Sequence, residues 1–238
     1  MKRKMKKRWL ILFIISAVVL LLVTLYYVMS ARGFQFFGRL VERIDTDKKI
    51  VYLTFDDGPN ENTDRILGTL EQLNVKASFF LIGQCIEETP VLTQQIIDAG
   101  HDIGNHSYTH PRLVFRSPAF IKKEIDQTNT LIINAGYHRE IFFRPPYGKK
   151  FLLLPWYLNQ IEQTTVMWTL EPDSYKEVNK DADSMAQYVI DNVSDGAIIL
   201  LHPMNDDTDK TLDAIKKIVS SLRDSGYSFE RLSDGIKQ

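Results

Sequence analysis

Two adjacent carboxylates, Asp56 and Asp57, stand at the end of an apolar, strand-like run. The run reads "KKIVYLTFDDGPN", and Gly58 and Pro59 follow the two acids directly. Neighbouring residues on a regular strand point to opposite faces, so the two carboxylates share one site only where the strand breaks. Gly58 and Pro59 supply that break. The alternative is an ordinary turn in which both acids are solvated.

A histidine pair is the second candidate group. His106 and His110 lie four residues apart in "NHSYTHP". On a helical turn, this spacing would place both rings on one face, where they could hold a metal ion, although a purely structural pair is equally compatible. With Asp57 as a third ligand, the set has the composition of a catalytic zinc site that leaves a position for water. Asp56 would then be free to act as the general base.

Further polar residues follow other strand-like runs. Arg144 could hold Asp56 ionised through a two-pronged contact, or it could form a surface salt bridge. The two prolines after it fix the backbone, so that Tyr147 and Gly148 could approach a substrate closely and a backbone N–H there could meet a developing oxyanion. His202 ends "GAIILLH" and could protonate a leaving amine. Its alternative role is that of a hydrogen-bonded residue in the core or at its rim.

These residues lie in a chain in which short apolar runs alternate with longer segments of helical period. Strand-like runs cover residues 49–55, 76–83, 101–107, 140–146, 164–170, 196–202 and 227–232. Helix-like segments cover residues 62–74, 89–100, 117–136, 181–194 and 209–226. Repeated strand-then-helix order predicts an α/β fold with a parallel sheet. A closed barrel would bring the polar strand ends to one rim, whereas an open nucleotide-binding sheet would need a Gly-x-Gly-x-x-Gly motif that is missing after the first strand.

The N-terminus has a different character. Residues 1–8 carry six Lys and Arg, and the uncharged run Trp9–Met29 is 21 residues long, enough to span a bilayer as a helix. We predict a basic cytoplasmic segment (1–8), a transmembrane signal-anchor (9–29), a juxtamembrane connector (30–47) and one extracellular domain (48–238). The alternative is a cleaved signal peptide and a secreted domain, although such peptides usually have a shorter apolar stretch.

Composition narrows the function classes. The chain has 238 residues, of which 44% are hydrophobic, so a sizeable core is expected. Beyond the N-terminal basic cluster, 23 Lys and Arg face 30 Asp and Glu, a formal charge of −7 that disfavours nucleic acid as a partner. Cys85 is the only cysteine, so the fold cannot rely on an intramolecular disulfide. No feature indicates an obligate protein partner.

Taken together, "TFDDGP", "HSYTH", "RPPYG" and "LLH" resemble four of the five motifs of the polysaccharide deacetylases of carbohydrate esterase family 4, the NodB-homology domain. The resemblance covers about residues 48–235. It implies a distorted (β/α) barrel with about seven parallel strands, and the removal of acetyl groups from N-acetylated sugars or acetylated xylan. It also implies that Asp56 is the catalytic base, that Arg144 positions this base and that His202 is the catalytic acid.

The same resemblance implies a metal and a set of substrate contacts. Asp57, His106 and His110 would hold a divalent cation, usually zinc, with cobalt, nickel and manganese as alternatives. Tyr147 would offer its backbone N–H to the oxyanion, and Leu200 would line the pocket for the acetyl methyl group. The expected substrate-binding residues are Pro146, Tyr147, Trp168, Tyr175 and Leu200.

The fourth motif departs from the family pattern. Where the family commonly has Asp-x-x-Asp-Trp, this chain has "WTLEPDSY", with Glu171 and Ser174 at the positions of the two acids and Tyr175 at that of the tryptophan. The first acid in the family tunes the acidic histidine, so we expect Glu171 to contact His202 with altered geometry and count it among the catalytic residues. Tyr175 keeps an aromatic face for a sugar.

We therefore predict a membrane-anchored, metal-dependent N-deacetylase that acts on N-acetylglucosamine or N-acetylmuramic acid units outside the cell. Because an anchor keeps the domain near its own cell surface, peptidoglycan is the expected polymer. One alternative is an O-deacetylase of xylan or another acetylated glycan, since the same site can cleave an ester. The altered fourth motif motivates another, a weakly active or noncatalytic glycan-binding relative.

Overall fold

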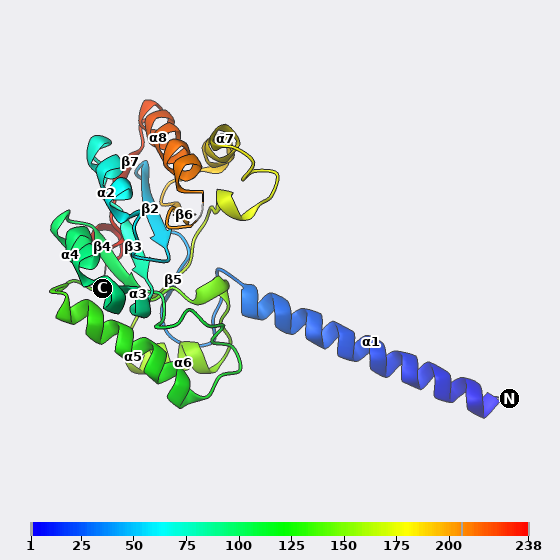
Figure 1. Ribbon diagram of the computed structural model, residues 1–238. Helices are drawn as coiled ribbons and strands as arrows, with labels where there is room; N and C mark the ends of the chain where they lie inside the picture. The colour runs from blue at the N-terminus through cyan, green and yellow to red at the C-terminus, as the bar shows by residue number, and fades with distance from the viewer. Residues whose placement is uncertain (1, 206, 238) are drawn as a thin grey trace.

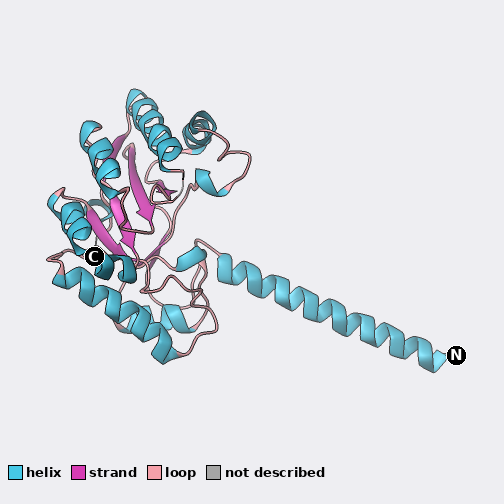
Figure 2. Ribbon diagram, viewed as in Figure 1, coloured by secondary structure: helices cyan, strands magenta, loops and turns pink. Residues whose placement is uncertain are grey.

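A long N-terminal helix projects from a rounded body in the computed structural model, which describes residues 2–205 and 207–237 (Figure 1). The helix, α1 (Lys2–Ser30), contains the stretch Lys6–Ser30, which is long and apolar enough to cross a bilayer by length and composition. Its side chains from residue 6 to residue 24 are exposed. The body places strands inside and helices outside, as the alternating pattern predicts (Figure 2).

Four parallel strands make up the main part of the sheet. β2 (Ile50–Asp56) has β3 (Ser78–Leu81) on one side and β6 (Ile198–Leu201) on the other, and β4 (Asp102–Asn105) continues beyond β3. Parallel strands put their C-terminal ends at the same edge. The residues that follow β2, β4 and β6 are therefore neighbours in space.

Short pairings close this sheet into a distorted barrel. Parallel bridges run from Asn105 to Phe143 and from Phe143 to Thr165, and another joins Leu170 to Ile199 of β6. The remaining strands are β1 (Leu40–Val41), β5 (Thr165–Val166) and β7 (Ser228–Glu230). The predicted fold class is confirmed, although the predicted strand 140–146 is reduced to the bridges at Phe143.

The helices cover the outside of the ring. Their bounds are α2 (Thr63–Gln72), α3 (Gly83–Glu88), α4 (Pro90–Asp98), α5 (Pro118–Asn134), α6 (Leu153–Gln160), α7 (Ala182–Asn192), α8 (Thr208–Asp224) and α9 (Leu232–Gly235). Two short 3-10 turns add η1 (Pro146–Gly148) and η2 (Pro172–Ser174). Each of the five predicted helical segments contains an observed helix, or overlaps one, with ends that differ by one or two residues. The helices α3 and α6 are too short to show a helical period.

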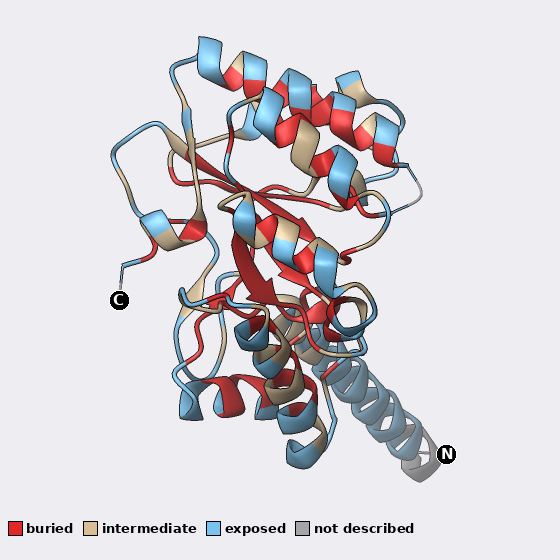
Figure 3. Ribbon diagram, turned by 60° about the vertical axis from the view of Figure 1, so that its left-hand side comes forward, coloured by how far each residue is buried: buried red, intermediate tan, exposed pale blue. Residues whose placement is uncertain are grey.

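β2 is buried on both faces, as a strand between helices and barrel interior must be (Figure 3). Val51, Leu53 and Phe55 belong to the core that lies under the helices, whereas Tyr52 belongs to a second core cluster inside the barrel. Because side chains alternate along a strand, Asp56 faces the interior together with Tyr52. The strand β2 therefore places the carboxylate of Asp56 at the rim of the barrel, facing its interior.

The segment predicted as a connector, residues 30–47, also takes part in the barrel. β1 pairs with β5, and Arg43 bridges Ala197. The Ile44 N–H donates to the carbonyl of Gly196 at 2.9 Å, and the Ile44 side chain is buried. The body thus begins near Leu40 rather than at residue 48, because pairings this short leave no periodic pattern in the sequence.

Gly196→Ala should destabilise this junction. Gly196 has a φ of +75°, and a Cβ would stand 1.8 Å from the carbonyl oxygen of Ile44. We expect the free energy of unfolding to fall by about 2–4 kcal/mol, from backbone strain and steric overlap. Urea unfolding of the full chain in detergent, followed by circular dichroism, measures the change.

Gly68→Ala in α2 is the matched control, because no described atom beyond its chain neighbours and the surrounding backbone of α2 lies within 4 Å of its Cβ position. This substitution should raise stability by about 0.5–1 kcal/mol, since glycine disfavours a helix interior. Equal unfolding midpoints for the two variants would contradict the close contact at Gly196.

Candidate active site

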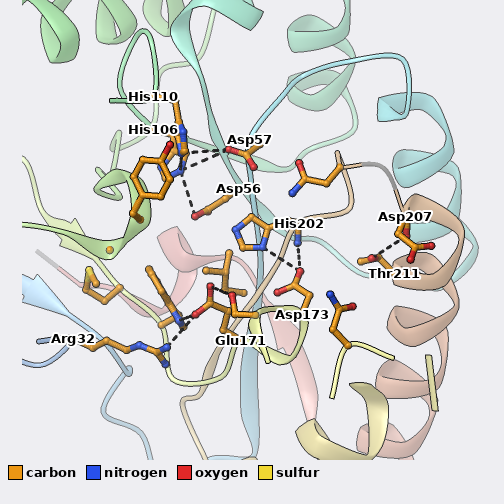
Figure 4. Close-up of a pocket in the computed structure, with 18 of the residues that line it drawn as sticks. Arg32, Asp56, Asp57, His106, His110, Glu171, Asp173, His202, Asp207 and Thr211 are labelled. Carbon is orange, nitrogen blue, oxygen red and sulfur yellow. Dashed lines mark hydrogen bonds and ion pairs between the residues drawn. The ribbon is translucent and has the colours of Figure 1, made fainter. Parts of the chain in front are cut away.

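A pocket of about 590 Å³ opens where the C-terminal ends of the barrel strands meet (Figure 4). Asp56 ends β2, His106 follows β4 and His202 follows β6. The predicted site residues that line the pocket are Asp56, Asp57, His106, His110, Tyr147, Trp168, Glu171, Leu200 and His202. The barrel therefore brings together groups that lie far apart in the sequence.

The two adjacent acids face the same space. β2 ends at Asp56, and Asp57 has a φ of 74°, so the strand breaks at Asp57 itself, one residue before the predicted Gly58–Pro59 break. Asp56 Oδ2 lies 3.6 Å from His106 Nε2, and Asp57 Oδ1 lies 3.9 Å from the same nitrogen. Aspartate tolerates the left-handed backbone better than most residues, which suits it to this turn.

Asp57, His106 and His110 form a three-ligand group. One ligand atom from each lies within 4.8 Å of the others, with His110 Nε2 at 3.6 Å from Asp57 Oδ1. The histidines lie in a loop after β4 rather than on the helical turn that the sequence analysis assumed, and His110 has a φ of 54°. Their proximity therefore comes from a left-handed loop and not from helical spacing.

The orientation of His106 fits a metal ligand. Its Nδ1 lies 2.8 Å from the carbonyl oxygen of Arg144. A carbonyl oxygen only accepts, so Nδ1 carries the hydrogen and Nε2 turns its lone pair toward Asp57 and His110. Burial lowers the pKa of His110, and the nearby His106 lowers it further, which keeps that ring neutral and able to coordinate. These residues thus suit a divalent cation.

Glu124 on α5 holds the histidine loop in place. Its carboxylate accepts hydrogen bonds from the backbone N–H groups of Tyr108 (2.9 Å) and Thr109 (2.8 Å) and from the Thr109 hydroxyl (2.9 Å). Asn105 supports the other side of the turn by accepting from the Ser107 N–H at 2.7 Å. The sequence analysis did not identify these supporting residues, because a buried acid on a helix carries no motif.

Arg144 lies beneath the pocket with no exposed surface. Its Nη1 donates to Asp56 Oδ1 at 2.7 Å and to Thr54 Oγ1 at 2.9 Å, while its other donors reach the carbonyls of Val166 and Met167. Among the described residues, Arg144 thus makes one hydrogen bond to Asp56, not the predicted two-pronged contact, because the barrel wall takes the remaining donors. Burial by itself raises the pKa of Asp56, but Arg144, His106 and His202 together hold it below the usual value.

His202 is held by Asp173 and not by Glu171. Asp173 Oδ2 accepts from the His202 backbone N–H at 2.6 Å and lies 3.1 Å from its Nδ1. Burial lowers the pKa of His202, but the hydrogen bond and charge of Asp173, with smaller contributions from Asp56 and Asp57, raise it to about 9. The hydrogen bond of the His202 ring goes to Asp173 and not to Glu171, because the turn η2 directs the carboxylate two residues later toward the histidine, although one carboxylate oxygen of Glu171 lies within 4.8 Å of both.

Glu171 holds two other residues of the pocket wall, Trp168 and Arg32. Its Oε2 accepts from Trp168 Nε1 at 2.8 Å and from Arg32 Nη2 at 3.0 Å. The guanidinium of Arg32 also lies 4.8 Å from the centre of the Trp168 ring, within the range of a cation–π contact. Arg32 was not a candidate from the sequence, since it belongs to the segment predicted as a connector.

The predicted substrate contacts divide into two groups. Leu200, Trp168 and Tyr147 line the pocket, and Tyr147 has a φ of 58°. Pro146 and Tyr175 are not among the described residues that line the pocket. Pro146 is buried, and the centre of the Tyr175 ring lies 5.5 Å from the centre of the Tyr188 ring.

The family model for polysaccharide deacetylases matches residues 43–166, just over half of the chain. The chain belongs to the polysaccharide deacetylase family. The resemblance seen in the four motifs is therefore confirmed. This family is metal-dependent, in agreement with the three-ligand group at the rim.

Two curated relatives have names that specify a polymer. A peptidoglycan-N-acetylglucosamine deacetylase of Bacillus cereus is 35% identical over 194 residues, which cover 78% of this chain and 68% of the relative. The peptidoglycan-N-acetylmuramic acid deacetylase PdaC of Bacillus subtilis is 31% identical over 193 residues, which cover 81% of this chain and only 40% of that longer protein.

Solved structures of the same family superpose well on this polysaccharide deacetylase. The Bc1960 peptidoglycan N-acetylglucosamine deacetylase, solved with a hydroxamate-type benzamide, has a TM-score of 0.77 and 33% identity, covering 82% of this chain and 92% of that one. BA3943 of Bacillus anthracis, described as a pseudoenzyme of the family, has a TM-score of 0.74 and 30% identity, covering 82% and 68%. Similar folds thus include active and inactive members.

Removal of one ligand should abolish tight metal binding. In His110→Ala, Zn²⁺ or Co²⁺ would keep two of its three protein ligands, and we expect affinity to fall more than about 100-fold, beyond the effect of losing an outer-shell partner. Isothermal titration calorimetry of the full chain in detergent measures this. His138→Ala is the control, because His138 is an exposed histidine outside the pocket; equal affinities for both variants would refute the ligand assignment.

Asp173→Asn should move the alkaline limb of the pH–rate profile. An acid catalyst must be protonated, so activity falls as pH rises through the His202 pKa of about 9. Loss of the Asp173 charge lowers that pKa, and we expect the limb to move to lower pH by about 1–3 pH units. Glu171→Gln removes a carboxylate that lies within 4.8 Å of the His202 ring but makes no hydrogen bond to it, so this variant should move the limb less. A larger shift in Glu171→Gln would restore Glu171 as the partner of His202.

Proposed function

We propose that this protein is a metal-dependent hydrolase that removes N-acetyl groups from N-acetylglucosamine or N-acetylmuramic acid units of a cell-surface polysaccharide, with peptidoglycan as the polymer. Family membership and the names of the two curated relatives support the reaction and the polymer. The observation that carries the proposal is the arrangement of Asp56 and His202 around one three-ligand group, each with its own ion-pair partner.

The two pairs suit opposite halves of an amide hydrolysis. Asp56, ionised beside Arg144, accepts a proton from the attacking water. His202, kept protonated by Asp173, donates a proton to the departing sugar amine. A divalent cation held by Asp57, His106 and His110 supplies Lewis acidity that makes water more acidic and polarises the acetyl carbonyl. We propose zinc, because two histidines and a carboxylate form one of its usual catalytic ligand sets.

Two pocket residues suit the acetyl group itself. We assign the backbone N–H of Tyr147 to the oxyanion, since its left-handed conformation lies on the pocket wall beside His110, with ring centres 4.8 Å apart. Leu200 belongs to β6, is almost fully buried and offers an apolar surface to the methyl group. Trp168, fixed by Glu171, provides an aromatic wall for the sugar.

The proposed location is the outer face of a membrane. The stretch Lys6–Ser30 has the length and apolar composition of a span, and the basic cluster of residues 1–8 favours an inward-facing N-terminus. We assign residues 9–29 to a signal-anchor and the body from residue 40 onward to the extracellular side, with the acetylated glycan and the membrane as partners. A domain that carries an excess of acidic residues remains unsuited to nucleic acid.

A noncatalytic role is the second candidate, favoured by the resemblance to the Bacillus anthracis pseudoenzyme and by Ser174 at an acid position. The contact of Asp173 with His202 argues against it, because the histidine retains a carboxylate partner despite the altered motif. Acetate release separates the two roles.

Acetate released from peptidoglycan, chitin oligomers and acetylated xylan, with and without chelator, tests the proposal on the full chain in detergent. We expect release from N-acetylated glycans, loss after chelation and recovery on addition of Zn²⁺. Asp56→Asn should lower kcat by about 10²–10⁴-fold, the usual contribution of a general base, while metal affinity stays within a few-fold. Full activity in Asp56→Asn would refute the assigned base, and glycan binding without acetate release would favour the noncatalytic role.

A further inference from the structure

The body carries an exposed apolar surface beside the end of α1. This surface, the aromatic patch, consists of Phe34, Phe36, Phe115, Phe151, Leu152 and Leu153. Phe115 is 72% exposed, and Phe34 and Phe36 are 48% and 45% exposed. The Phe151 ring joins the segments, because its centre lies 5.7 Å from that of Phe36 and 5.8 Å from that of Phe115. Three stretches of chain thus contribute to one continuous patch.

An apolar hollow of about 150 Å³ lies within the aromatic patch. Its lining, between the loop at 113–115 and the start of α6, is entirely apolar. Contiguous apolar surfaces on a protein usually mark a site of contact with a partner or a membrane. The occupant must be identified from what surrounds the aromatic patch.

The end of α1 is fixed to the body next to this patch. The backbone N–H of Lys150 donates to the carbonyl of Met29 at 3.0 Å, and its buried ammonium donates to the carbonyl of Ala31. The Lys149 ammonium donates to the Ser30 hydroxyl and lies 4.0 Å from the Tyr26 ring centre. The contacts run directly into Phe151 and Leu152 of the aromatic patch, so the patch keeps a fixed position relative to the helix.

The length of α1 indicates where the aromatic patch would lie relative to a bilayer. The uncharged run Trp9–Met29 spans about 31 Å as a helix, close to the thickness of a hydrocarbon core. Tyr26 and Tyr27 near its end are residues typical of the membrane interface. Phe34 and Phe36 follow the end of α1 by four and six residues, which places them at the level of the lipid headgroups.

The charges around the aromatic patch suit the same surroundings. Arg112 and Arg116 are exposed on the loop that carries Phe115, and Lys149 precedes Phe151. Basic side chains beside an apolar surface are attracted to anionic lipid headgroups. The aromatic patch is continuous with the end of the candidate span at Ser30, which favours the bilayer over a partner protein as its occupant.

We propose that the aromatic patch inserts into the headgroup region of the bilayer that α1 spans, so that the barrel lies on the lipid surface. This inference rests on the anchor in the proposed function and adds a second membrane contact to it. Ser30 and Arg32 border the catalytic pocket, so the mouth of the pocket lies at the level of the same headgroups. The substrate class that follows is an acetylated glycan held at the membrane surface, such as one attached to a lipid.

A spin label tests the membrane contact without any turnover. In a Cys85→Ser background, a nitroxide on Phe115→Cys and one on Ser220→Cys, an exposed position of α8, are compared in the full chain in nanodiscs that contain phosphatidylglycerol. At position 115 we expect collisions with oxygen to exceed those with a water-soluble nickel chelate several-fold, and the reverse at position 220. Equal, water-like behaviour at both positions would overturn the proposal, as would protection of position 115 from both reagents, which indicates a second copy.

Activity tests the consequence for the substrate. Phe36→Asp combined with Phe115→Asp should lower acetate release from a lipid-linked acetylated glycan in the same nanodiscs about tenfold and leave release from a soluble acetylated oligosaccharide unchanged. Ser220→Asp is the matched control and should change neither. Equal losses on both substrates, or no loss on either, would overturn the proposal. An unmodified chain that is inactive on both substrates would refute the proposed function, whereas the spin labels would still decide the membrane contact.

Discussion

The interior of the barrel depends on a buried ion pair, in which the guanidinium of Arg144 meets the carboxylate of Asp56. A charge left unpaired at this depth would cost on the order of 3–5 kcal/mol. The cost is offset because Thr54 and two carbonyls of the wall accept from the other donors, and the Phe80 ring centre lies 4.0 Å from the guanidinium carbon. Phe80 fits there because its neighbour across the sheet, Gly104, has no Cβ, which would stand 2.5 Å from the ring. The contacts that join the strands thus also orient the base.

The rim around this pair is built from backbone conformations that most residues avoid. Of the seven described residues other than glycine with positive φ, four lie at the site: Asp57, Ser107, His110 and Tyr147. Such conformations cost about 1–3 kcal/mol each and persist only where neighbours hold them. Glu124 and Asn105 do so for the histidine loop. The ligand group is therefore rigid before any cation binds, which lowers the entropy lost on binding.

The sequence was most informative where one physical rule controls the outcome. The alternation of short apolar runs with segments of helical period predicted an α/β fold with a parallel sheet, and parallel strands necessarily place Asp56, His106 and His202 at one rim. Prediction failed where a local turn decides the geometry. The turn η2 gives His202 the carboxylate of Asp173 in place of Glu171, and a difference of two residues cannot be read from composition. Arg32 lies 139 residues from its partner Glu171, and such a distant pairing leaves no local pattern.

The docked end of α1 has a consequence for where the protein can act. An enzyme on a long, flexible tether explores a hemisphere whose radius grows with the length of the tether. Here Lys150 makes hydrogen bonds to Met29 and Ala31 at the end of the helix, so under the proposed anchor the body would keep a fixed height above the bilayer. Its reach is then two-dimensional, set by lateral diffusion in the plane of the anchor. Under the proposed anchor, deacetylation would be confined to glycan that lies within a fixed distance of the bilayer.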